Sequence, residues 1–110
     1  MWLFLNDAFL SVVDKGDPSR HTLLVRGRRP GDIERVFPDA KVTEGEGTDY
    51  RFRARLPREA VAQRFADAAR QIDYGNFKGS VDDQERHDAY MKVWEAMYRY
   101  QERVNRGPTH

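Results

Sequence analysis

The sequence has 110 residues, enough to bury one hydrophobic core but not two. Charged residues make up 34% of the chain and aromatic residues 12%, so it has the apolar groups that disordered segments lack. There is no cysteine, which excludes thiolate catalysis and cysteine-based zinc sites and favours a cytoplasmic location. The net charge is +1, but residues 20–58 hold ten Lys or Arg and six acids, so this middle third is basic.

The apolar N-terminal segment is short, and Asn6 and Asp7 interrupt it. It is too short for a signal peptide or a membrane span, so we expect no association with a membrane. Strand-forming residues on both sides of the Asn–Asp step predict a tight hairpin within residues 2–14, with one bent strand as the alternative. A loop over residues 15–19 leads to a strand over residues 21–28.

A short helix is expected over residues 30–37, beginning at an Asp32 N-cap and ending before Pro38. A strand over residues 41–44 and a turn over residues 45–48 follow it.

Residues 49–56 alternate in character along the predicted strand. One side carries the apolar residues Tyr50, Phe52, Ala54 and Leu56, and the other carries Arg51, Arg53 and Arg55. Alternation with a period of two indicates a strand with one buried face and one face in solvent.

Two longer helices complete the chain. Pro57 suits the first turn of a helix that runs to about Asp73, with one continuous apolar stripe. The last helix spans about 82–104, and acidic residues at its start complement the helix dipole. Residues 105–110 are expected to form a frayed tail.

The resulting order, β(β)β–α–ββ–α–α, predicts a single α+β domain over residues 1–110. Its sheet would have four or five strands, antiparallel or mixed, with helices on one face. The β–α–β–β–α portion over residues 21–73 suggests a ferredoxin-like split unit that the N-terminal strands complete.

The main candidates for a partner-binding surface are Arg26, Arg28, Arg51, Arg53 and Arg55. The last three share one face of their strand, and the first two join it if the two strands are neighbours. Planar guanidinium groups suit carboxylates and phosphates. A sheet that reads nucleic acid would add exposed aromatic side chains, and the alternation places Tyr50 and Phe52 on the opposite side. The alternative is a merely solvated face, with Glu44 and Glu46 in reach to pair with the arginines.

The last helix is the second candidate surface. An a/d pattern runs through Tyr90, Val93, Met97, Tyr100 and Val104, so pairing between two copies of the chain is one hypothesis. Packing against the sheet explains the same stripe. Trp94 and Tyr98 form an adjacent stripe, and residues of these types are enriched in interface cores, so both are predicted to contact a partner.

Patterns for metal binding and catalysis are weak. Asp83 and His87 are spaced to share one helical face, but two ligands do not make a metal site. His21 near Asp17 is no stronger a signal for acid–base chemistry. No serine lies in a nucleophile elbow, and no glycine pattern cradles phosphate. We therefore predict no catalytic residue, metal or cofactor.

The segment Ile72–Val81, together with Arg86–Trp94, resembles a stretch found in small bacterial proteins of about this size. The segment Arg29–Pro38 is similar in style to theirs. The resemblance covers most of the chain and implies no reaction, cofactor or site residue. In size and composition the chain is also similar to phage-encoded inhibitors such as anti-CRISPR proteins, which act by covering a partner's surface.

These observations predict a non-catalytic binding or regulatory module that recognises a protein partner by surface complementarity. Inhibition of that partner and dimer formation are two hypotheses within this prediction. The alternative is a nucleic-acid-binding accessory protein that uses the five arginines. The third hypothesis is a small enzyme built around His21 or His87.

Overall fold

A computed structural model describes residues 1–45 and 47–106. Its contacts divide the chain into two compact units, Met1–Tyr74 and Gly75–His110, which are described separately. The elements in chain order are β1 (Trp2–Phe4), β2 (Phe9–Val13), β3 (Thr22–Gly27), α1 (Asp32–Val36), β4 (Thr43–Glu44), β5 (Phe52–Pro57), α2 (Arg58–Arg70), the 3₁₀-helix η1 (Lys78–Ser80) and α3 (Gln84–Arg106).

The first unit contains one five-stranded sheet, and every neighbouring pair of strands is antiparallel. The strand order is β1-β2-β3-β5-β4, so β5 lies between β3 and β4. This is the split arrangement predicted for the β–α–β–β–α portion, and β2 completes it beside β3. The α+β class and the element order are confirmed.

The N-terminal strands form the predicted hairpin rather than one bent strand. Phe4 pairs with Phe9, and the Leu5 N–H donates to the Ala8 carbonyl at 2.8 Å across the turn that holds Asn6 and Asp7. The polar turn residues therefore set the register of β1 against β2.

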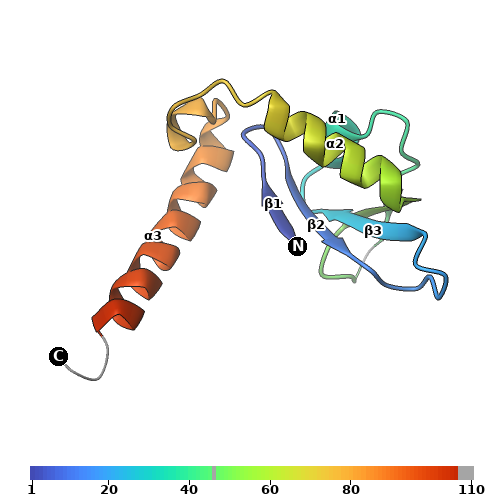
Figure 1. Ribbon diagram of the computed structural model, residues 1–110, viewed down its shortest axis with the longest axis horizontal. Helices are drawn as coiled ribbons and strands as arrows, with labels where there is room; N and C mark the ends of the chain where they lie inside the picture. The colour runs from blue at the N-terminus through green and yellow to red at the C-terminus, as the bar shows by residue number, and fades with distance from the viewer. Residues whose placement is uncertain (46, 107–110) are drawn as a thin grey trace. The chain divides into compact units, whose positions relative to one another are not determined.

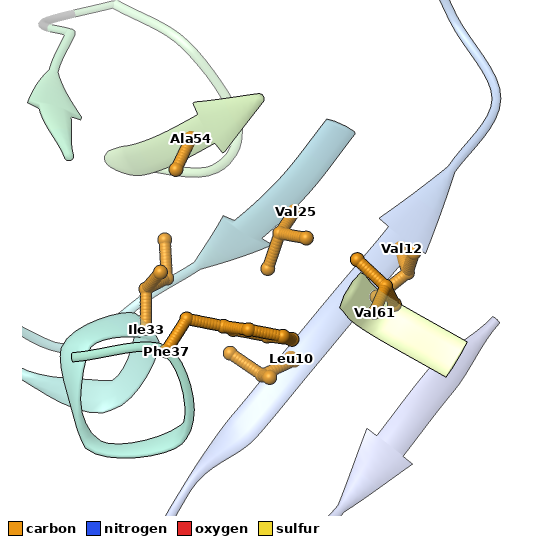
Figure 2. Packing of buried hydrophobic residues seen from close by; sticks show 7 residues of the cluster. All are labelled: Leu10, Val12, Val25, Ile33, Phe37, Ala54 and Val61. Atoms are coloured by element: carbon orange, nitrogen blue, oxygen red, sulfur yellow. The ribbon is translucent and has the colours of Figure 1, made fainter. Parts of the chain in front are cut away.

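Helices α1 and α2 lie on the same side of the sheet (Figure 1). Phe37, which follows α1, projects toward Leu10 and Val25, while Val61 of α2 lies beside Val12 (Figure 2). All of these side chains are buried. Phe52, Ala54 and Leu56 of β5 also belong to this core, so the predicted apolar side of the strand does meet the helices.

The predicted capping role of Asp32 is wrong. Gly31 occupies the N-cap with a φ of 90° and makes no side-chain capping bond. Asp32 is the first helical residue and is 1% exposed, and its carboxylate accepts a hydrogen bond from the Phe9 N–H at 3.1 Å. The carboxylate therefore ties α1 to the hairpin instead of closing its own helix.

The second unit consists of η1 and α3. The Asp83 carboxylate accepts a bond from the Arg86 N–H at 2.9 Å, which caps the first turn of α3. The helix begins later than predicted and runs to Arg106, two residues into the predicted tail. The rest of that tail, residues 107–110, lies outside the described residues. Among residues 1–45 and 47–106, the helices do not include one with the length and hydropathy that a membrane span requires.

Candidate binding surface

The sheet carries its arginines on the face opposite α1 and α2. Because β3 and β5 are neighbours, Arg26 lies directly across from Arg53, and Leu24 lies across from Arg55. The conditional prediction that the arginines of the two strands share a face is confirmed for this trio. We call Arg26, Arg53 and Arg55 the arginine face.

Tyr50 is the main departure from the predicted pattern. The strand begins only at Phe52, so the alternation does not extend back to Tyr50. The tyrosine is 3% exposed, but it is not part of the hydrophobic cluster that packs against α1 and α2. The guanidinium carbons of Arg26 and Arg28 lie 4.4 and 4.0 Å from its ring centroid. The prediction that it sits on the helix side is wrong, because its ring serves as a platform for two arginines.

Two of the five predicted arginines are paired with acids. Arg51 donates a hydrogen bond from Nε to the Glu44 carboxylate at 2.6 Å. The alternative of a merely solvated face predicted this pairing with Glu44. Arg28 donates to the Asp49 carbonyl at 3.0 Å and lies 3.4 Å from the Asp49 carboxylate. Glu46, the other predicted acidic partner, lies outside the described residues. These two arginines are therefore partly neutralised.

The arginine face differs, because its described partners are neutral. Arg26 donates to the buried Ser11 hydroxyl at 2.9 Å. Arg55 donates to the Thr22 hydroxyl at 3.2 Å and to the Lys15 carbonyl at 2.8 Å. Within residues 1–45 and 47–106, the buried Nε atoms of Arg26 and Arg53 have no hydrogen-bond partner.

The loop beside Arg55 is held by a compact hydrogen-bond network. Asp17 accepts bonds from the hydroxyls and the backbone N–H groups of both Ser19 and Thr22. The Ser19 and Thr22 hydroxyl bonds are the main reason that the pKa of Asp17 lies well below its usual range. This network fixes the Thr22 hydroxyl and the turn that supplies the Lys15 carbonyl, so Arg55 meets an ordered partner.

The first two strands add aromatic side chains to the same face. Trp2 pairs with Ser11, and Ser11 pairs with Arg26, so Trp2 ends the cross-strand row that holds Arg26 and Arg53. It is 66% exposed.

Phe4 and Phe9 lie on this face as well, with ring centroids 4.7 Å apart. Sequence reasoning missed this aromatic edge, although alternation in the hairpin already placed Trp2 and Phe4 on one side. The sequence does not show the strand order, and it is the strand order that places Trp2 and Phe4 beside the arginines.

Trp94 and Tyr98 lie on α3 in the second unit. Their rings stack with centroids 5.5 Å apart, and Lys78 Nζ lies 4.4 Å from the Trp94 centroid. They are 47% and 49% exposed. The two predicted surfaces thus belong to different units of the chain.

The candidate histidines do not gather a site around them. His21 is exposed at the start of β3, and His87 Nδ1 lies 3.6 Å from an Asp88 carboxylate oxygen. Asp83, the proposed metal partner of His87, caps α3 instead. Among the described residues, no group of three or more His, Asp or Glu side chains is arranged to hold a metal ion.

Comparison with known proteins adds no relationship. No protein-family model, curated protein or solved structure matches the chain.

Proposed function

We propose that this protein is a non-catalytic binding module whose arginine face docks on an acidic protein surface. The observation that carries the proposal is the direct pairing of Arg26 with Arg53 across neighbouring strands. Like charges in this position destabilise a sheet, and no carboxylate among the described residues is paired with either side chain. A bound carboxylate would offset this repulsion through charge-assisted hydrogen bonds.

The arrangement also favours recognition over simple solvation. Arg26 is held by Ser11 and by the Tyr50 ring, and Arg55 by Thr22 and a backbone carbonyl. Side chains that are already ordered lose less conformational entropy when a partner binds. Two ordered guanidinium groups, together with that of Arg53, match a small cluster of carboxylates, the chemistry of an acidic protein patch.

Single-stranded nucleic acid is the second candidate, favoured by one specific observation. Trp2 is exposed in the same cross-strand row as Arg26 and Arg53, and Phe9 lies against it with ring centroids 6.4 Å apart. Bases stack on exposed aromatic side chains while arginines contact phosphates. The engagement of Arg28 and Arg51 with acids limits the positive track available to a phosphate backbone, so we rank this candidate second.

Two further proposals concern partners and location. A second copy of the chain is the other protein partner that we propose, and it would bind through α3.

The absence of cysteine supports a cytoplasmic location, where thiols stay reduced and disulfides are rare.

Fluorescence anisotropy with two labelled probes tests the docking proposal. The probes are an acidic peptide of alternating aspartate and glycine, and an oligothymidine of matched length. We expect the peptide to bind more tightly, and an R26Q/R53Q double variant to lose about tenfold in affinity for it. R64Q, on α2 on the other side of the sheet, is the control and should bind like the parent protein.

The same titrations separate the two candidates. Tighter binding of oligothymidine, with a steep loss on adding salt and on Trp2→Ala, would replace the protein-partner proposal with the nucleic-acid one. Equal affinity of R26Q/R53Q and R64Q for both probes would remove the arginine face as a binding surface.

A further inference from the structure

Within its own unit, helix α3 leaves its apolar side uncovered over most of its length. Every residue from Lys92 to Arg106 is exposed, which is 15 of the 23 helical residues. The exposed set includes large apolar side chains: Val93 at 39%, Met97 at 57%, Tyr100 at 49% and Val104 at 52%. Helices of this length owe most of their stability in proteins to packing of an amphipathic face.

The charges of this segment occupy the other side of the helix. Lys92, Glu95, Arg99, Glu102 and Arg106 follow one another at steps of three and four residues, with alternating sign. The Arg99 guanidinium lies 2.6 Å from the Glu95 carboxylate. This side is therefore suited to solvent, and it leaves the apolar side free of carboxylates.

The start of the helix is packed within its own unit, and this limits the free segment. Phe77 stacks on Tyr90 with ring centroids 5.8 Å apart, and Lys78 covers part of Trp94. The exposed a/d positions begin at Val93 and end at Val104, a stretch of about 18 Å at 1.5 Å per residue.

We propose that this segment pairs with the same segment of a second copy of the chain, antiparallel and across a two-fold axis. In this register Val93 faces Val104 of the second copy, and Met97 faces Tyr100 of the second copy. Each layer then occurs twice, as two-fold symmetry requires.

Side-chain size and polarity favour the antiparallel pairing over the parallel one. A parallel pair would place two Tyr100 rings in one layer and bury both hydroxyl groups against each other. The antiparallel pair sets each Tyr100 beside a flexible Met97 and lets its hydroxyl reach the rim. It also opposes the two helix dipoles.

The apolar area available is enough for a specific dimer. Trp94 and the four a/d residues expose on the order of 450 Å² per helix, judged from their exposed fractions. With Gln101 and Arg103 at the rim, complete burial of this surface on both helices would remove about 1,000 Å² from solvent in total, the size at which specific interfaces begin. A dimer that forms at micromolar concentration and dissociates on dilution is expected.

Analytical ultracentrifugation of the full chain tests the pairing. At micromolar concentration the mass should be twice the 12.9 kDa of one chain, and Met97→Lys should return it to that of one chain. Asn105→Lys adds the same charge away from the a/d pattern and should leave the dimer intact. Circular dichroism checks that each variant keeps its helix. A single-chain mass for the parent protein, or a dimer that Met97→Lys leaves unchanged, would overturn the proposal.

Disulfide cross-linking tests the orientation, because the natural chain has no cysteine. A mixture of Val93→Cys and Val104→Cys chains should cross-link faster than either variant alone. Faster cross-linking within each single variant would mean a parallel pair and would overturn the antiparallel arrangement. The dimer and the arginine face fail independently, since a monomeric variant keeps Arg26 and Arg53 and can still be titrated with the acidic peptide.

Discussion

The sheet unit buries its apolar residues in a core, whereas the helical unit by itself leaves large apolar residues of α3 uncovered. In the sheet unit, Leu10, Val25 and Val61 are at most 1% exposed, and charged side chains occupy the opposite sheet face. In the helical unit, Met97 and Tyr100 are about half exposed, and Arg99 pairs with Glu95 on the other side of the helix. The sheet unit therefore has its own core, whereas the helical unit by itself does not bury the apolar side of α3. The binding that we propose for each unit would accordingly rest on different chemistry.

The largest expected effect comes from removing a core side chain of the sheet unit. Leu10→Ala should lower the free energy of unfolding by about 2–5 kcal/mol, because it leaves a cavity among fully buried neighbours. Val104→Ala on α3 should cost less than about 0.5 kcal/mol at a concentration where the protein is monomeric. Urea unfolding followed by circular dichroism measures both. Similar losses for the two variants would contradict the difference between the units.

The next effect concerns the link between α1 and the hairpin. Asp32→Ala should lower the free energy of unfolding by about 1–3 kcal/mol, because the Phe9 N–H loses its acceptor. Asp39→Ala, at an exposed position beyond α1, is the control and should change stability by less than about 0.5 kcal/mol. Urea unfolding again gives the comparison, and equal effects would show that the buried carboxylate contributes nothing specific.

The smallest effect has the opposite sign. Arg53→Gln should raise the free energy of unfolding by about 0.2–1 kcal/mol at low salt, because it removes the repulsion from Arg26. The gain should shrink as salt is added, since added ions screen the repulsion. Arg64→Gln is the matched control. A loss of stability on Arg53→Gln would mean that the Arg26–Arg53 pair supports the fold and is not kept for binding.

Local sequence patterns predicted most of the fold. Alternation from Phe52 to Leu56 placed Arg53 and Arg55 opposite the core, and polar residues at Asn6 and Asp7 placed the hairpin. Element ends were less accurate. The strand that begins at Phe52 was predicted to start at residue 49, and this error put Tyr50 on the wrong side. Periodicity identifies a strand but does not say where its hydrogen bonding starts.

The order of residues is enough to show which positions alternate, which segments turn, and which helical faces are apolar, because these features depend on neighbours a few positions apart. The three-dimensional structure was needed to show that Arg26 meets Arg53, that Trp2 joins their row, and that Asp32 binds the hairpin. Those outcomes depend on strand order, register and packing between segments far apart in the chain. Local preferences leave such long-range pairings open, since one pattern fits several arrangements.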